Sequence, residues 1–126
     1  MDETYISFYL KANRIRVFIE ALRRLGRPNR ICFLLDNDLR NIIVAPYAKK
    51  DLKSHKVPLS SYSQPQGVEV CSKKLCRIIA QAKSWDVNHS YCAPGKVLLS
   101  QKIAIFDLDA AFAIKPIVKE NSSDSN

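Results

Sequence analysis

Two stretches of the chain place their apolar residues at helical spacing, and the second stretch repeats the first sixty residues later. The intervals of three and four residues in each stretch predict one apolar face of an amphipathic helix. The positions in the first stretch are Ile15, Phe18, Ile19, Leu22 and Leu25. The matching positions in the second stretch are Leu75, Ile78, Ile79, Ala82 and Trp85.

Strand-like runs surround the first expected helix. Residues 5–10 alternate apolar and polar side chains, and Asn13 is placed to cap the helix that follows. Gly26 is suited to end that helix, and Pro28 prevents its continuation. Residues 30–35 and 41–47 are two further apolar runs with turn-forming residues between them, which predicts a hairpin.

The same order returns around the second expected helix. Residues 67–72 form a short alternating run that ends at Ser72, a good N-cap residue. Residues 90–107 predict one or two strands, with a turn expected at Pro94 and Gly95. The polar stretch between the two patterns contains Pro58, Pro65 and Gly67 and predicts a connector.

These patterns predict an α+β protein built as a tandem β-α-β-β repeat, with two amphipathic helices packed on a mainly antiparallel sheet. The expected organisation is a single domain over 1–118. Its two repeats are expected at about 4–48 and 67–110, joined by a basic connector at 49–66, with a flexible tail at 119–126.

The net positive charge of the chain favours functions that involve polyanions. The 126 residues carry a net charge of +8, which attracts polyanions. The expected helices bear many basic residues outside their apolar faces, and each Lys or Arg that neutralises a phosphate releases counterions. We therefore expect a small nucleic-acid-binding protein that contacts mainly the phosphate backbone, with DNA as the first choice. The candidate contact residues are Arg14, Arg16, Arg23, Arg24, Arg27, Lys73, Lys74 and Arg77.

An acidic protein surface is the alternative partner. A protein-binding adaptor or inhibitor encoded by a phage or plasmid could use the same charges and add its edge strands to a partner's sheet. Homo-oligomers are compatible with either expectation. Tyr47, Tyr62, Tyr91 and Trp85 could stack on bases, although the place of Trp85 in the apolar pattern favours the core.

Other classes are disfavoured by what the sequence lacks. The chain has only three glycines and neither a phosphate-binding loop nor a dinucleotide-binding motif, so we expect no enzyme and no cofactor. It has no apolar run of the length that a membrane span needs and no signal-peptide pattern at its start, so we expect no membrane contact and a cytoplasmic location.

The cysteines leave one alternative open. Cys71, Cys76, His89 and Cys92 have a spacing superficially like that of a zinc knuckle, but the tight turn between the first pair is missing. Buried free cysteines, including Cys32, are the favoured interpretation.

Three resemblances accompany these patterns. The segment "NRIRVFIEALRRLG" resembles the AbrB and MraZ swapped-hairpin transcription factors, which implies a strand, a helix and a hairpin, with Arg14 and Arg16 facing DNA. The basic helix faces are similar in architecture to those of DNA sliding-clamp domains. The segments "SKKLCRIIAQAKSWD" and "IAIFDLDAA" look like small uncharacterised proteins of mobile elements in Gram-positive bacteria, a resemblance that implies no activity.

Overall fold

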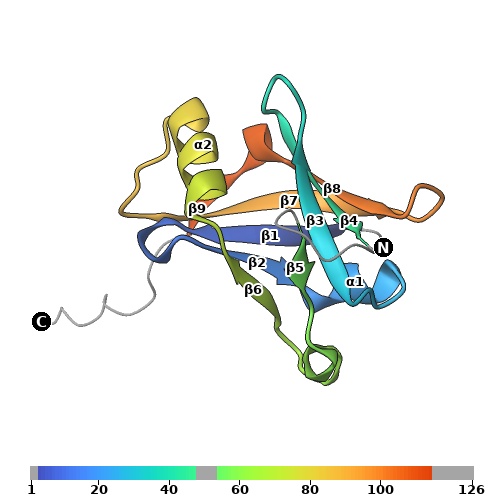
Figure 1. Ribbon diagram of the computed structural model, residues 1–126. Coiled ribbons are helices and arrows are strands. Elements are labelled where there is room, and N and C mark those ends of the chain that lie inside the picture. The colour runs from blue at the N-terminus through green and yellow to red at the C-terminus, as the bar shows by residue number, and fades with distance from the viewer. Residues whose placement is uncertain (1–2, 48–53, 115–126) are drawn as a thin grey trace, which may run out of the picture.

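A computed structural model describes residues 3–47 and 54–114, and this part of the chain forms one nine-stranded antiparallel sheet (Figure 1). The strands are β1 (Glu3–Tyr9), β2 (Arg14–Phe18), β3 (Arg30–Leu35), β4 (Asn41–Pro46), β5 (His55–Lys56), β6 (Gly67–Cys71), β7 (Ser90–Leu98), β8 (Ile103–Asp107) and β9 (Phe112–Ile114). The helices are α1 (Ile19–Arg24) and α2 (Lys73–Lys83), with 3-10 turns η1 (Leu10–Ala12), η2 (Leu59–Ser63) and η3 (Leu108–Ala110). The expected tail at 119–126 and the start of the expected connector lie outside the described residues.

The sheet curls into a nearly closed barrel. Its strand order is β5-β3-β4-β8-β7-β1-β2-β6, with β9 pairing beside β8 on β7. Alternating residues of each strand point to the inside, as the two-residue period of a strand requires. The inner face is apolar, and its largest fully buried side chains are Phe8 of β1 and Phe106 of β8.

The expected tandem repeat is wrong. In a repeat of two β-α-β-β units, each half would build its own strand set, with a helix lying on it. Instead, strands from the two halves of the chain alternate as neighbours: β1 pairs with β7, β2 with β6, and β4 with β8. Neither half buries its apolar face alone, and the helices close the ends of a barrel rather than cover a sheet (Figure 1).

The observed first helix is also shorter than the helix that the apolar pattern predicts. Ile15 and Val17 are buried in strand β2, and the helix begins only at Ile19. Asn13 does not cap it, because Asn13 has a φ of 56° and ends the 3-10 turn η1. Residues 14–18 fit the two-residue period of a strand as well as the helical pattern, and pairing of β2 with β1 and β6 selects the strand there.

The hairpin at 30–47 is confirmed, since β3 and β4 pair antiparallel from Ile31 to Leu35. The turn expected at Pro94 and Gly95 is wrong, because β7 runs straight through both residues. On one side of β7, β9 pairs with residues up to Cys92, and β8 pairs from Gly95 onward. Pro94 falls between these two neighbours, where its missing N–H leaves no gap in that ladder.

The N-cap expected at Ser72 is confirmed. Its side-chain oxygen accepts a hydrogen bond from the Leu75 N–H at 3.3 Å, and its own N–H donates to the Asn13 carbonyl at 2.9 Å. Ser72→Ala is expected to lower the free energy of unfolding by about 1 kcal/mol, the usual effect of losing a helix cap. Urea unfolding of both proteins measures this, and an unchanged midpoint would show that the cap contributes nothing.

Candidate nucleic-acid interface

The two basic helices lie at opposite ends of the barrel. Strand β2 leads into α1 and β6 leads into α2, and the two strands run antiparallel, with Phe18 opposite Gly67 and Arg14 opposite Cys71. The helices therefore leave the pair in opposite directions (Figure 1). The eight candidate residues form two separate basic regions, with Arg14 and Arg16 on the strand between them, and not one continuous surface.

At the α1 end, Arg23 is engaged in holding the protein together. One nitrogen of its guanidinium donates to Glu20 at 3.0 Å, and another donates to the carbonyls of Tyr62 at 2.8 Å and Gln64 at 3.3 Å. Arg27 lies over the Tyr62 ring, 5.7 Å from its centre. These contacts join η2 to α1. A ligand at this end would therefore compete with the protein's own groups for Arg23 and Arg27.

Arg14 and Arg16 point to the outside of β2 and share one carboxylate. Arg16 donates to Glu69 of β6 through two nitrogens, at 2.5 and 3.1 Å, and Arg14 lies 3.4 Å from the other oxygen of the same group. The hydrogen bond from Arg16 holds the pKa of the Glu69 carboxyl below its usual value. Together, the two arginines of β2 and the one acid of β6 leave a net charge of +1.

Glu69→Gln tests this pairing through the pH dependence of stability. Because the folded state lowers the Glu69 pKa, the carboxylate stabilises the protein at pH values above the usual glutamate pKa, and this contribution is lost as the pH falls through the folded pKa. The pair is partly exposed, so we expect an effect below about 1 kcal/mol at pH 7. Thermal unfolding from pH 3 to 7 should show a shallower acid slope for the variant; parallel slopes would contradict the pairing.

At the α2 end, the cations have no such partners. Lys73, Lys74 and Arg77 are exposed, and no residue in the described ranges forms an ion pair with them. Lys83, at the far end of the same helix, differs, since it pairs with Asp109. The first turn of α2 contains no acidic residue. Positive charge is therefore concentrated where the helix leaves β6.

A fourth cation joins this group from a different element. Lys11 of η1 and Arg77 of α2 line a cleft of about 330 Å³, together with Asn13 and Asn88. Neither cation has a carboxylate partner among the described residues, and the described lining of the cleft contains no acid. Amides and cations converging on one cleft provide hydrogen-bond donors suited to an anion. Lys11 was not among the expected residues, because it lies in neither helical pattern.

The helical face of α2 is rotated from the expected one. Its buried residues are Cys76, Ile79 and Ala80, whereas Ile78 is 37% exposed and Ala82 is exposed. The apolar pattern thus identified the helix but misplaced part of its buried face.

The aromatic residues expected to stack on bases lie in different environments. Trp85 stacks on Tyr91, with ring centres 4.4 Å apart, and also packs against Phe8, so it lies partly buried against the core rather than within it. Tyr62 is buried and donates its hydroxyl to the Pro28 carbonyl at 2.7 Å. Burial raises the pKa of Tyr62 to about 12. Tyr47 lies at the rim of a separate hollow, described below.

The cysteines are free, and Cys32, Cys76 and Cys92 are buried while Cys71 is exposed. His89 pairs with Asp86 at 3.0 Å. Within the part of the chain that the structure describes, no group of three or more His, Cys, Asp or Glu side chains is placed to hold a metal ion. The described helices also include none that is long and apolar enough to cross a membrane.

Comparisons with protein-family models, with curated proteins and with solved structures find no match to this chain. The resemblances to swapped-hairpin transcription factors, sliding clamps and mobile-element proteins therefore stay predictions.

Proposed function

We propose that this chain is a small, non-catalytic nucleic-acid-binding protein of the cytoplasm that contacts the phosphate backbone, with duplex DNA as the expected partner. The observation that supports the proposal is the group of cations at the α2 end of the barrel. Lys73, Lys74 and Arg77 lie on the first half of α2, and Arg77 shares a cleft with Lys11. None of the four has a carboxylate partner in the described ranges.

This arrangement is unfavourable for the protein by itself. Lys73 and Lys74 occupy the first turn of α2, where the helix dipole favours negative charge. Lys73 and Arg77 are four residues apart on the helix, a spacing at which like charges repel. A phosphate bound at this end offsets both costs, and its binding releases counterions from the nucleic acid.

Arg14 and Arg16 extend this basic region along β2. Arg14 lies opposite Cys71, next to the start of α2, and 51% of its side chain is exposed. Glu69 competes with a phosphate for both arginines, so we assign them a smaller share of the binding energy. Arg23, Arg24 and Arg27 at the α1 end stay candidates for a second contact with a longer nucleic acid.

Fluorescence anisotropy over a salt series tests the proposal. Labelled duplex DNA, single-stranded DNA and RNA are titrated with the protein at several ionic strengths. Four phosphate contacts predict a slope of log affinity against log salt of about −3.6 for duplex DNA. Absence of binding to all three nucleic acids at low salt would refute the proposal, because nonspecific attraction of a +8 protein should be strongest there.

An acidic protein partner is the second candidate function, and one apolar groove favours it. The groove has a volume of about 550 Å³, lies between β3 and α2, and contains Leu34 and Ile78, whose side chains are 51% and 37% exposed. Lys74 lines the same groove and could pair with a carboxylate of the partner. Affinity for an acidic, apolar peptide that exceeds the affinity for DNA at physiological salt would favour this function over the first.

A further inference from the structure

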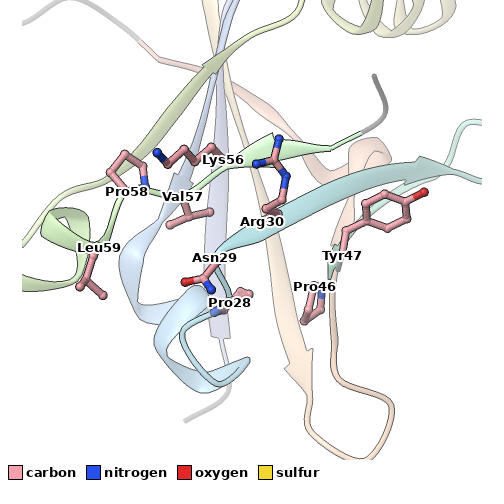
Figure 2. A pocket seen from close by; sticks show the side chains of 9 residues that line it. All are labelled: Pro28, Asn29, Arg30, Pro46, Tyr47, Lys56, Val57, Pro58 and Leu59. Carbon is pink, nitrogen blue, oxygen red and sulfur yellow. The ribbon is translucent and has the colours of Figure 1, made fainter. Parts of the chain in front are cut away.

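A separate hollow lies where the β3–β4 hairpin opens, beside β5 and η2. Its volume is about 850 Å³, within the range of small-molecule sites. It is lined by residues from three segments of the chain, 28–30, 46–47 and 56–59 (Figure 2). None of the eight basic candidate residues from the sequence lines it, so it is a different place from the α2 end, although Tyr47, a candidate for stacking on bases, does line it.

Two cations lie on neighbouring strands at this hollow. Arg30 of β3 and Lys56 of β5 are directly opposite in the antiparallel register, and both line the hollow. Side chains opposite each other in such a pair lie on the same face, where like charges are destabilising. The described lining contains no carboxylate to separate them. An anion between the two side chains would relieve this repulsion.

A hydrogen bond fixes the Arg30 guanidinium in a position where it could bind an anion. Its Nε donates to the Ser54 hydroxyl at 2.9 Å, and this is its only side-chain partner among the described residues. The contact uses one edge of the guanidinium and leaves the two terminal nitrogens for a ligand (Figure 2). Arginine presents these nitrogens as a planar fork that matches two oxygens of a phosphate.

The remaining lining is apolar and stiff. Pro28, Pro46 and Pro58 come from three different segments, and the ring of each fixes one backbone dihedral angle. Tyr47 lies at the rim, and Leu59 contributes a side chain that is 80% exposed. The tyrosine ring can stack on a planar group and the proline rings extend this apolar surface, so the hollow combines an anion site with an apolar platform.

We propose that this hollow binds a nucleoside phosphate, with the phosphate between Arg30 and Lys56 and the base against the prolines and Tyr47. The ligand is a free mononucleotide or the phosphorylated end of a single strand, which share this chemistry. A base inside a duplex could not reach the platform without leaving its stack. The proposal is independent of duplex binding at the α2 end and survives if that binding fails.

Amide chemical shifts of the ¹⁵N-labelled full chain test this site, with AMP, adenosine and inorganic phosphate as probes. We expect AMP to shift the amides around Arg30 and Lys56, with a Kd below about 1 mM. Adenosine and phosphate should each bind at least about tenfold more weakly, since each makes only part of the contacts. Hexadeoxyadenylate with and without a 5′-phosphate then distinguishes a strand end from a free mononucleotide. Binding that requires the 5′-phosphate indicates the strand end, and absence of binding by both oligonucleotides indicates the mononucleotide.

Arg30→Gln/Lys56→Gln should weaken AMP binding by at least about tenfold, and Lys96→Gln/Lys102→Gln is the control with the same net charge. If the first variant does not fold, Lys56→Gln alone replaces it, because Lys56 is exposed on a two-residue strand. Unchanged AMP affinity in the Arg30 and Lys56 variants, or shifts confined to other regions, would overturn the proposal. Phosphate binding as tightly as AMP would overturn the assignment of a nucleoside.

Discussion

Lys73→Glu/Lys74→Glu/Arg77→Glu is expected to weaken duplex binding by at least about a hundredfold at 0.1 M salt, since three phosphate contacts become repulsive. The helix should survive the change. Glutamate in the first turn interacts favourably with the helix dipole, and none of the three side chains is buried. Anisotropy gives the affinity, and circular dichroism with thermal unfolding verifies that the barrel is intact.

A neutral pair separates local contact from overall charge. Lys73→Gln/Lys74→Gln and Lys96→Gln/Lys102→Gln have the same net charge, but the second pair lies on β7 and in the turn that follows it. Only the first pair should reduce the salt slope, by about one unit for each residue. Equal losses in the two variants would show that the protein binds through its general charge and not through the α2 end.

Gly95→Ala is expected to cause a large loss of stability, because an added Cβ would overlap the neighbouring strand. A Cβ at this position would lie 2.3 Å from the Ile105 carbonyl oxygen and 2.8 Å from the Phe106 Cα. Strand β7 is paired here on both sides, to Thr4 of β1 and to Phe106 of β8, so the backbone cannot move away. We expect a loss of about 3 kcal/mol or more, at the upper end of the cost of overpacking.

Gly26→Ala is the matched control for this prediction. Gly26 has a φ of 91°, so alanine there is strained, but a Cβ would meet no atom within 4 Å. The expected cost is about 1 kcal/mol, from backbone strain alone. Urea denaturation of the two variants compares them directly, and a Gly95 variant as stable as the Gly26 variant would show that β7 and β8 can separate at this point.

Local signals in the sequence predicted several elements correctly. The β3–β4 hairpin and the Ser72 cap follow from neighbouring residues alone, which is why their patterns sufficed. Gly95 shows the limit of such signals, because Pro followed by Gly is typical of a turn, whereas here the glycine allows two strands to approach closely. Only glycine fits at position 95 because β8 lies so close to it, and β8 is not part of the local sequence pattern.

The candidate site shows the same limit. The sequence identified Lys73, Lys74 and Arg77, since all three lie on one amphipathic helix. It could not show that Glu69 engages Arg14 and Arg16, because that contact depends on the register between β2 and β6. Lys11 and the opposed pair Arg30 and Lys56 were likewise missed, since each acquires its neighbours only when distant segments of the chain come together.

The alternation of strands from both halves of the chain has a consequence for folding during synthesis. Strand β1 has no second neighbouring strand until β7 leaves the ribosome. Strand β4 likewise has no second neighbour until β8 has been synthesised. Pairings between segments so far apart in sequence form slowly, because a long loop must close before any contact stabilises it. A nascent chain that ends before β7 therefore exposes unpaired strand edges and the apolar interior to other chains, and early termination should yield aggregates rather than a folded first half.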